Sequence, residues 1–443
     1  MLDHLATGAM IRLNSSVSYK SLIMVLVVLL ACVSLLAASP ATTAAARGEE
    51  VHLVPAVYVF GDSTVDVGNN QYLPGNSALQ LPYGIDFPHS RPTGRFSNGY
   101  NVADFVAKLL GFKRSPPAYL SLTPRTSRQI LRGLRGVNYA SGGSGILDTT
   151  VSTPDLVVPK TKTRLLERKK KVIPDRLVAG HSHLDPCSNC FCTRMSMDQG
   201  NTITLTKQIE YFAATKSKML AASGGGQGSS SVDDLLSKSL FLISDGGNDM
   251  FAFIQQNRSA SEAPALYADL LSNYTRHLQA LYSLGARRFG IVDVPPLGCV
   301  PSVRVISPDG ATRCVDAANA LASGFNDALR ALLANLTATP GGAMPAARYS
   351  VGSSYAVVSH FTAHPAAAGF REVATACCGG GRLNAQTGCT PNATYCSDRD
   401  RFLFWDGVHG TQATSRKGAV AIFSAPPEMG FAAPINFKQL VSS

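Results

Sequence analysis

The chain has 443 residues, of which 45% are hydrophobic, and it carries a formal net charge of +11. It is long enough to bury a large core, and its length alone allows two or three domains. A positive net charge is compatible with nucleic-acid binding. The sequence contains no motif of a nucleic-acid-binding module, however, so we predict no nucleic-acid partner.

The N-terminus has the three-part pattern of a secretory signal. Arg12 and Lys20 precede an uncharged apolar run, residues 22–36, and small residues follow the run. The run is shorter than the roughly 20 residues that a membrane span needs, although a retained signal anchor is the alternative. We therefore predict a signal peptide over residues 1–46, a secreted protein, and no membrane span once the signal is removed. N-terminal sequencing of the secreted protein distinguishes the two.

After the signal, predicted strands alternate with predicted helices. An apolar strand over residues 57–60 ends at Gly61, and a helix begins near Asn98, its predicted cap, and ends at Gly111. The next predicted elements are a buried strand, a helix, a strand and a helix, over residues 240–243, 265–284, 289–294 and 317–336. This alternation predicts an α/β sheet with helices on both faces. The composition of Ser223–Ser231 predicts a flexible surface loop.

The cysteines and glycosylation sequons agree with export. Six cysteines of the C-terminal half form an even set that predicts three disulfides: Cys299, Cys314, Cys377, Cys378, Cys389 and Cys396. Cys299 and Cys314 are the expected pair because they are near in sequence and apart from the others. The other four allow three connectivities, of which the Cys377–Cys378 bridge is disfavoured because joining neighbours strains the backbone. The candidate glycosylation sites are Asn257, Asn273, Asn335 and Asn392.

Four short motifs contain the parts of a nucleophilic serine site. Such a site needs a serine, a base that takes its proton, a group that holds the base, and donors for the developing oxyanion. Ser63 ends a GDS motif directly after a strand, while Asp406 and His409 begin and end a DGVH motif. Asn248, in a GGND motif, offers a side-chain amide, and Gly142, in an NYASGG motif, offers a backbone N–H. Each motif alone is more often a turn or a cap, but the four together are a strong signal.

In this order the motifs resemble those of the GDSL-type lipases and esterases of the SGNH hydrolase superfamily, from about Val57 to Leu440. Flanking segments VDVGNN, PPLGC and PINF are similar to the plant branch of that family, whose members are exported to the cell wall or apoplast. The resemblance implies a three-layer αβα sandwich, flavodoxin-like, with a mainly parallel sheet. There is no GxSxG motif, which disfavours the α/β-hydrolase fold.

Carried over residue by residue, the resemblance assigns roles to the four motifs. Ser63 would be the nucleophile, His409 the general base and then the general acid, and Asp406 the residue that orients His409. The oxyanion hole would consist of the N–H groups of Ser63 and Gly142 and the side chain of Asn248. The resemblance therefore implies a catalytic triad and three oxyanion donors from four separate segments.

Two positions beside these residues depart from the family pattern. Thr64 stands where a leucine usually follows the serine, and Gly410 stands where a proline usually follows the histidine. Neither change removes a reacting group. We expect them to affect the rate, for Gly410 through a looser loop at His409, rather than the kind of reaction.

Residues 151–199 look unlike the rest of the chain, because they are basic and show no sustained helix or strand period. They contain five residues at spacings that could bind zinc: His181, His183, Cys187, Cys190 and Cys192. The second ligand pair of known zinc modules is absent, so we predict no metal.

A different explanation fits this segment better. Joining Thr150 to Gly200 gives continuous sequence similar to the family, and the ends of the segment could be encoded as a splice donor and a splice acceptor. Our hypothesis is that residues 151–199 are a translated unspliced intron or a gene-model error. Otherwise they are a disordered insertion in a single hydrolase domain over residues 47–443.

The sequence thus predicts an ester hydrolase that works through an acyl-enzyme on Ser63, with no cofactor. The substrate would be a small-molecule or polymer ester, either a lipid or an acetylated carbohydrate. An acyltransferase with the same triad is an alternative, and so is a binding protein whose site the insertion has disabled. Labelling by a fluorophosphonate probe separates the binding protein from the two enzymes. The acyl and alcohol parts of the substrate and the oligomeric state stay open.

Overall fold

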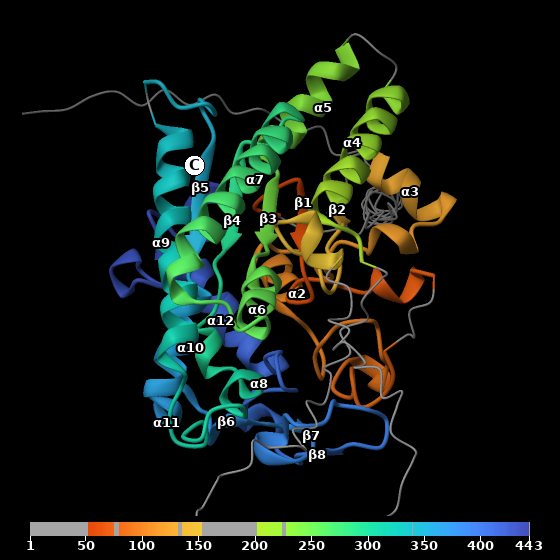
Figure 1. Ribbon diagram of the computed structural model, residues 1–443. Coiled ribbons are helices and arrows are strands. Elements are labelled where there is room, and N and C mark those ends of the chain that lie inside the picture. Colours follow the sequence, from red (N-terminus) through yellow and green to blue (C-terminus); the bar gives the residue numbers. More distant parts are fainter. Residues whose placement is uncertain are drawn as a thin grey trace, which may run out of the picture. The chain divides into compact units, whose positions relative to one another are not determined.

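A six-stranded sheet lies at the centre of the computed structural model (Figure 1). The strand order is β10-β5-β4-β3-β1-β2, with β1 to β5 parallel and β10 antiparallel to β5. The part β2-β1-β3-β4-β5 has the order of flavodoxin-like doubly wound sheets, so the predicted α/β fold is confirmed. The strands are β1 (Ala56–Gly61), β2 (Arg135–Asn138), β3 (Leu240–Ser244), β4 (Arg288–Val292), β5 (Arg348–Gly352) and β10 (Ala432–Ala433).

The described residues belong to one compact unit, Val51–Ser443. They cover the ranges 52–74, 79–131, 135–152, 202–223, 227–338 and 340–442. The predicted signal peptide lies outside these ranges, as does the predicted insertion apart from its first two residues. Within the described ranges, no helix has the length and apolar character needed to cross a bilayer.

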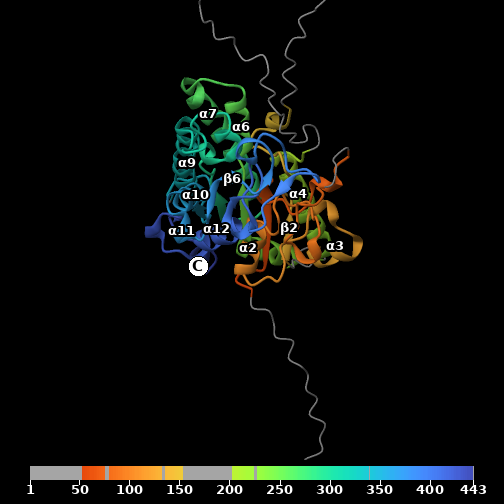
Figure 2. The same cartoon turned by 90° about the horizontal axis from the view of Figure 1, so that it is seen from below.

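Alternating side chains along the strands produce two helical layers. Tyr58 and Phe60 of β1 pack on one face with α4, α5, α7 and α9, whereas Val57 and Val59 pack on the other with α2, α10, α12 and α13. In Figures 1 and 2, α3 and α4 lie at the β2 edge of the sheet, and α9 and α10 lie at the β5 edge. The helices are α2 (Val102–Leu109), α3 (Pro124–Leu131), α4 (Leu205–Ala222), α5 (Gln227–Lys238), α6 (Gly247–Gln255), α7 (Ala263–Ser283), α8 (Pro301–Arg304), α9 (Asp316–Thr337), α10 (Ser354–Ala363), α11 (Pro365–Ala368), α12 (Gln412–Ser424) and α13 (Phe437–Ser442).

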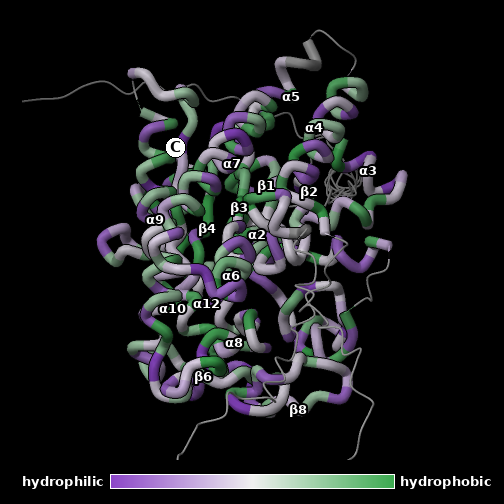
Figure 3. The backbone as a smooth tube through the Cα atoms, in the orientation of Figure 1, coloured by the Kyte–Doolittle hydropathy of each residue, from purple (hydrophilic) through white to green (hydrophobic). Residues whose placement is uncertain are grey.

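The central strands β3 and β4 are mostly apolar because helices cover both faces of the sheet. All five residues of β3, with the sequence LFLIS, are buried, and β4 has the similar sequence RFGIV. Figure 3 shows these strands in hydrophobic colours, whereas the surrounding helices alternate between hydrophilic and hydrophobic residues. This pattern explains why residues 240–243 and 289–294 could be predicted as strands.

The predicted cap of α2 was wrong. The cap is Asn101, whose side chain accepts the N–H of Asp104 while Asp104 accepts the N–H of Asn101. This reciprocal pair of hydrogen bonds is a capping box. The prediction had assigned the cap to Asn98, another asparagine three residues earlier in the chain. Asn98 instead accepts the N–H of Gln412, and it thereby joins two segments that are far apart in sequence.

The GGND motif and the predicted loop Ser223–Ser231 are both partly helical. The GGND motif does not form a loop beyond Gly246, because α6 begins at Gly247 and Asn248 lies in its first turn. Helix α5 begins at Gln227, inside the predicted loop Ser223–Ser231. Polar composition predicted a loop there, but Val232 and Leu236 of the same helix are buried in the core, and this burial outweighs the weak local propensity.

Three disulfides are present among the described residues. Cys299 pairs with Cys314, as predicted. The other four form nested bridges, Cys377–Cys396 and Cys378–Cys389, and the two neighbouring cysteines do not pair with each other. The nested pair lies beside two small sheets, formed by β6 (Glu372–Ala376) with β9 (Phe402–Phe404) and by β7 (Cys378–Gly379) with β8 (Thr394–Tyr395).

Removing the Cys377–Cys396 bridge by changing both residues to serine should lower the free energy of unfolding by about 3 kcal/mol, because the bridge closes a loop of 19 residues. Urea unfolding of the double variant and the wild type measures this difference. The Cys299→Ser/Cys314→Ser variant, which opens a loop of similar size elsewhere, is the control for general loss of a disulfide. An unchanged unfolding midpoint would show that the Cys377–Cys396 bridge contributes nothing to the free energy of unfolding.

Candidate active site

Ser63 lies in a tight turn directly after β1, at the carboxyl end of the sheet. Gly61 has a φ of 130°, and a Cβ atom there would lie 1.9 Å from the carbonyl oxygen of Ser244, so only glycine fits. The Asp62 side chain accepts the N–H of Thr64 at 2.8 Å, which closes an Asx turn around Ser63. The turn brings Ser63 to the wall of a cavity.

A buried glutamine on α4 holds this turn from behind. The side chain of Gln208 accepts the N–H of Gly61 at 2.8 Å and donates to the Gly61 carbonyl at 2.9 Å. The same nitrogen also lies 3.1 Å from the Ser144 hydroxyl and 2.9 Å from the Ile203 carbonyl, so its two N–H groups are shared among three acceptors. Gln208 thus connects the turn before Ser63 to the glycine-rich segment after β2. The sequence analysis missed it, since a glutamine in a helix has no local signal for such a role.

His409 joins Ser63 to Asp406. Its Nε2 lies 2.9 Å from the Ser63 hydroxyl oxygen, and its Nδ1 lies 2.8 Å from Oδ2 of Asp406. The other carboxylate oxygen of Asp406 accepts the backbone N–H groups of Val408 and His409, at 2.8 and 2.7 Å. These bonds orient the carboxylate toward the imidazole, and the imidazole toward the serine. The structure thus brings together the three residues that the sequence analysis selected.

Two backbone hydrogen bonds hold the ends of the loop that carries Asp406 and His409. The loop follows β9, and the Trp405 N–H donates to the His409 carbonyl at 2.7 Å while the Thr411 N–H donates to the Leu403 carbonyl at 3.1 Å. Gly410 lies between these bonds, so the loop is held on both sides of the position where the family usually has proline.

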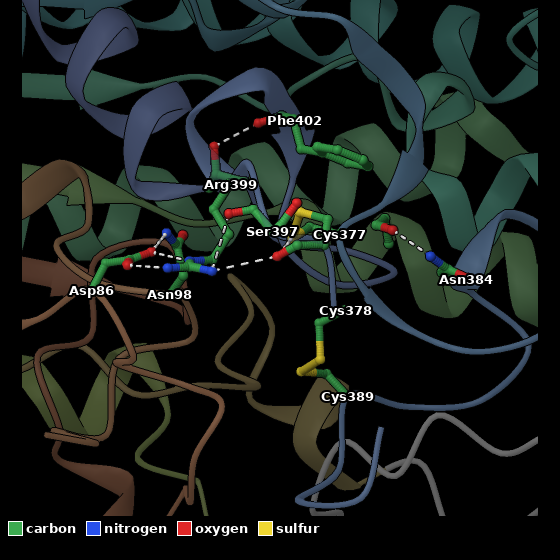
Figure 4. Close-up of a disulfide and its surroundings, with 12 residues drawn as sticks. Asp86, Asn98, Cys377, Cys378, Asn384, Cys389, Ser397, Arg399 and Phe402 are labelled. Carbon is green, nitrogen blue, oxygen red and sulfur yellow. Dashed lines mark hydrogen bonds and ion pairs between the residues drawn. A yellow bond between two sulfur atoms is a disulfide. The ribbon is translucent and has the colours of Figure 1, made fainter. Parts of the chain in front are cut away.

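The segment before α2 binds this loop from the side. Tyr83 donates its hydroxyl to Oδ2 of Asp406 at 2.7 Å. Nearby, Asp86 forms a two-bond ion pair with Arg399, at 2.6 and 2.8 Å, and also accepts from the Asn98 amide. Figure 4 shows this ion pair beside the nested disulfides. The sequence analysis missed Tyr83 and Arg399, because their partners lie more than 300 residues away in the chain.

The pKa shifts of His409 and Asp406 agree with the geometry of the hydrogen bonds between them. Burial alone lowers the pKa of His409, but the carboxylate of Asp406, with a smaller effect from Asp62, outweighs burial and raises that pKa above its usual value. Burial alone raises the pKa of Asp406, but the charge and hydrogen bonds of His409, with the bond from Tyr83, hold that pKa below its usual value. Asp406 is therefore ionised where an imidazole that takes a proton needs a negative partner.

The proposed oxyanion donors differ in their surroundings. Asn248 lines the same cavity as Ser63 and His409, and one N–H of its amide donates to the Ser144 carbonyl at 2.7 Å, which leaves a second N–H. No hydrogen bond found among the described residues uses the N–H of Ser63. The N–H of Gly142, in contrast, donates to Asp66 at 3.3 Å, and Gly142 does not line the cavity. Gly142 is therefore the donor that the geometry supports least.

Two buried carboxylic acids lie near Asn248. Burial raises the pKa of Asp62. Burial, with the nearby charges of Asp62 and Asp249, raises the pKa of Asp245 well above its usual value. Both groups therefore favour the neutral form more than an exposed carboxyl does.

The chain on both sides of the predicted insertion is fixed close to this site. Asp249 of α6 accepts the Ile146 N–H at 2.9 Å and the hydroxyl of Thr150. On the far side, Thr202 donates its hydroxyl to the Gly142 carbonyl at 3.0 Å. The His and Cys residues considered for zinc lie outside the described residues. Within the described ranges, no group of three or more metal-binding side chains is found.

Comparisons with known proteins agree with this architecture. The sequence model of the family described as GDSL-like lipase/acylhydrolase matches residues 57–422. Three proteins of Arabidopsis thaliana, each named GDSL esterase/lipase, are 34%, 32% and 33% identical to this chain over 87%, 88% and 88% of its length. The matches cover 89%, 90% and 89% of those proteins. The chain therefore belongs to the GDSL-like lipase/acylhydrolase family, and it is a carboxylic ester hydrolase.

Proposed function

We propose that this protein is a secreted serine hydrolase that cleaves carboxylic esters through an acyl-enzyme on Ser63. The observation that carries the proposal is the continuous chain of hydrogen bonds from Ser63 through His409 to Asp406, at the wall of a cavity. A serine, a base and an orienting carboxylate in this arrangement are the parts that acyl transfer needs.

The reaction follows from the geometry. The Ser63 oxygen attacks the ester carbonyl while Nε2 of His409 takes its proton, and the negative charge moves to the carbonyl oxygen. His409 then gives the proton to the departing alcohol, which leaves the acyl group on Ser63. A water molecule attacks this ester with His409 again as base, and Ser63 regains its proton as the acid departs. Asp406 stays ionised throughout and stabilises the imidazolium.

Acyl-enzyme formation can be tested by the time course of alcohol release. When deacylation is the slower step, an activated ester should give a rapid burst of alcohol, equal in amount to the enzyme, before the steady rate. Alcohol release without covalent attachment of the acyl group to Ser63, in samples quenched with acid and measured by intact mass, would contradict the mechanism.

The Asn248→Ala change should lower kcat by about 100- to 1000-fold with little change in KM, because an oxyanion donor acts mainly in the transition state. Steady-state kinetics with one ester measure both parameters. Gln255→Ala, at the other end of α6 and exposed, is the matched control. An equal fall in both variants would assign the effect to the helix rather than to the donor.

We place the protein outside the cell, in the wall or apoplast. The support is the signal-like N-terminus, the disulfides and four candidate glycosylation sites. Asn257, Asn335 and Asn392 are exposed, as attachment of a glycan requires. Asn273 is half-buried, and its side chain donates to the Asp269 carbonyl within α7, so it is the least suited of the four.

Deleting residues 151–199 should raise the yield of secreted enzyme that reacts with a fluorophosphonate probe. The three cysteines of this segment add thiols that can mispair with the six that form disulfides. Both forms should be expressed side by side, with transcript sequencing across the Thr150–Gly200 junction. An inactive deletion form beside an active full-length form would show that the segment is a functional part.

A further inference from the structure

The cavity at Ser63 extends well beyond the residues that react. Its lining reaches past the ends of β3 and β4 to α10 and α12. Away from the triad, its walls are mainly aliphatic and aromatic. The residues that define this far part lie on β4, α10 and α12, and they are Val292, Val357, Val358 and Ile422.

Three of the polar side chains that line this far part, Asp293, Ser354 and Thr414, are already bonded to the protein, whereas no hydrogen bond is found among the described residues for the hydroxyl of Ser415. The carboxylate of Asp293 accepts from Arg330 at 2.5 Å and from the Ser353 hydroxyl at 2.8 Å. Ser354 donates to the Asp293 carbonyl, and Thr414 donates to the Leu403 carbonyl at 2.5 Å. A sugar placed here would replace only part of the hydrogen bonds to water that it loses, whereas a hydrocarbon chain would lose none.

The length of the cavity can be estimated from the sheet. From Ser63 at the end of β1, the wall passes β3 and reaches β4, two strand spacings away, or about 10 Å. Three bonds of an extended chain span about 3.5 Å, so 10 Å corresponds to an acyl chain of about eight carbons.

We infer that the far part of this cavity holds the acyl chain of an aliphatic ester of medium length, so that the substrates are fatty acyl esters rather than acetylated carbohydrates. The inference rests on the proposed function, because it needs the acyl group to be attached at Ser63. The alcohol part would leave through the open mouth of the cavity.

The first test is a series of p-nitrophenyl esters with acyl chains from acetyl to palmitoyl. Each added methylene should raise kcat/KM about fourfold up to about eight carbons, because burying a methylene is worth about 0.8 kcal/mol. Acetates of alcohols with graded length form the second series, in which chain length should matter little. Highest activity on acetyl, or a preference that follows the alcohol chain instead, would overturn the inference.

The second test blocks the cavity. Gly418 of α12 lines the far part, and a Cβ atom there would touch only Val357, at 3.7 Å. Gly418→Leu should therefore fit into the helix while filling the cavity, and it should lower kcat/KM for octanoyl esters at least tenfold while leaving acetyl esters unchanged. Val420→Leu, on the exposed side of the same helix, is the control.

The outcomes separate this inference from the proposed function. If Gly418→Leu lowers hydrolysis of all chain lengths equally while Ser63 still reacts, the acyl chain lies elsewhere, but the hydrolase proposal stands. If the wild type hydrolyses no ester of either series and Ser63 does not react with a fluorophosphonate, the proposed function itself fails.

A second inference rests on a different contact, the hydrogen bond from Tyr83 to Asp406. Oδ2 of Asp406 accepts both this hydroxyl, at 2.7 Å, and Nδ1 of His409, at 2.8 Å. Burial and the adjacent carboxylate raise the pKa of Tyr83 well above its usual value, so the hydroxyl keeps the proton that it donates. The Tyr83 ring packs edge-on against Trp405, and Asp86 three residues later is paired with Arg399.

The geometry points to Tyr83 as a positioning residue that fixes the carboxylate of Asp406 in the plane where it meets His409. It touches no reacting atom and acts through Asp406. Its hydroxyl also shares the negative charge of Oδ2, which moderates the effect of that charge on His409.

Tyr83→Phe removes only the hydroxyl and tests this role. It should lower kcat about tenfold with KM unchanged, and it should move the acid limb of the kcat/KM profile to higher pH, because the unshared carboxylate raises the pKa of His409 further. Tyr267→Phe, which loses a hydroxyl bond of 2.7 Å to the Leu321 carbonyl and does not line the cavity, is the control for general loss of such a bond. An unchanged pH profile, or equal effects in both variants, would contradict the assignment.

Discussion

Replacing Ser63 by alanine is expected to reduce ester hydrolysis by roughly five to six orders of magnitude, because the group that forms the acyl-enzyme is lost and His409 has no proton to take. The side chain is small and nearly buried, so the change should leave the fold intact. Steady-state hydrolysis of an octanoyl ester, with purified protein and circular dichroism as a check on folding, measures the effect.

The control for this change is Ser237→Ala, which removes a hydroxyl from a half-buried position on α5 where it bonds only to the Asp234 carbonyl of the same helix. Its activity should equal that of the wild type. Residual activity of Ser63→Ala above a hundredth of the wild-type value would mean that another residue is the nucleophile, and the proposed mechanism would then be wrong.

The second large effect is expected for Asp406→Asn, which should lower kcat about 10⁴-fold. The amide has nearly the same shape as the carboxylate, but it carries no charge and can stabilise the wrong tautomer of His409. Four donors also converge on this side chain, namely the Tyr83 hydroxyl, the backbone N–H groups of Val408 and His409, and Nδ1 of His409, and an amide has only one oxygen to satisfy them.

The pH profile gives this prediction a second measurement. In the wild type the carboxylate of Asp406 raises the pKa of His409, so the base becomes neutral only at a higher pH than an ordinary histidine. Without that charge the pKa falls, and the acid limb of the remaining activity should move to lower pH. An acid limb at the same pH in Asp406→Asn and the wild type would show that Asp406 does not control the pKa of His409.

The residues that react could be selected from the sequence because each lies in a short motif. Ser63 follows a strongly apolar strand, and the three-residue spacing of Asp406 and His409 puts both on one loop. Strands β1, β3 and β4 could be predicted for the same reason, since burial on both faces leaves continuous apolar runs. Strand β5, with the sequence RYSVG, has no such run and was not predicted. Strand β2 could not be predicted either, because it is a four-residue edge strand that begins with Arg135 and Gly136.

The residues that position the site could not be predicted. Gln208 and Tyr83 act through partners more than 140 residues away, and no local pattern marks a helical glutamine or a tyrosine beside a proline. For Gly142 the sequence revealed the residue but not its geometry. Its motif was recognised, but the direction of its N–H depends on the position of Asp66, which only the folded chain fixes.

The central claim is that Ser63 is the nucleophile, and covalent labelling tests it most directly. The full-length secreted protein is treated with a fluorophosphonate probe, digested, and mapped by mass spectrometry. The account predicts one probe molecule per protein, attached to the peptide that contains Ser63, with labelling lost in Ser63→Ala and slowed in Asp406→Asn. A label on any other residue, or an active enzyme that takes up no label, would contradict it.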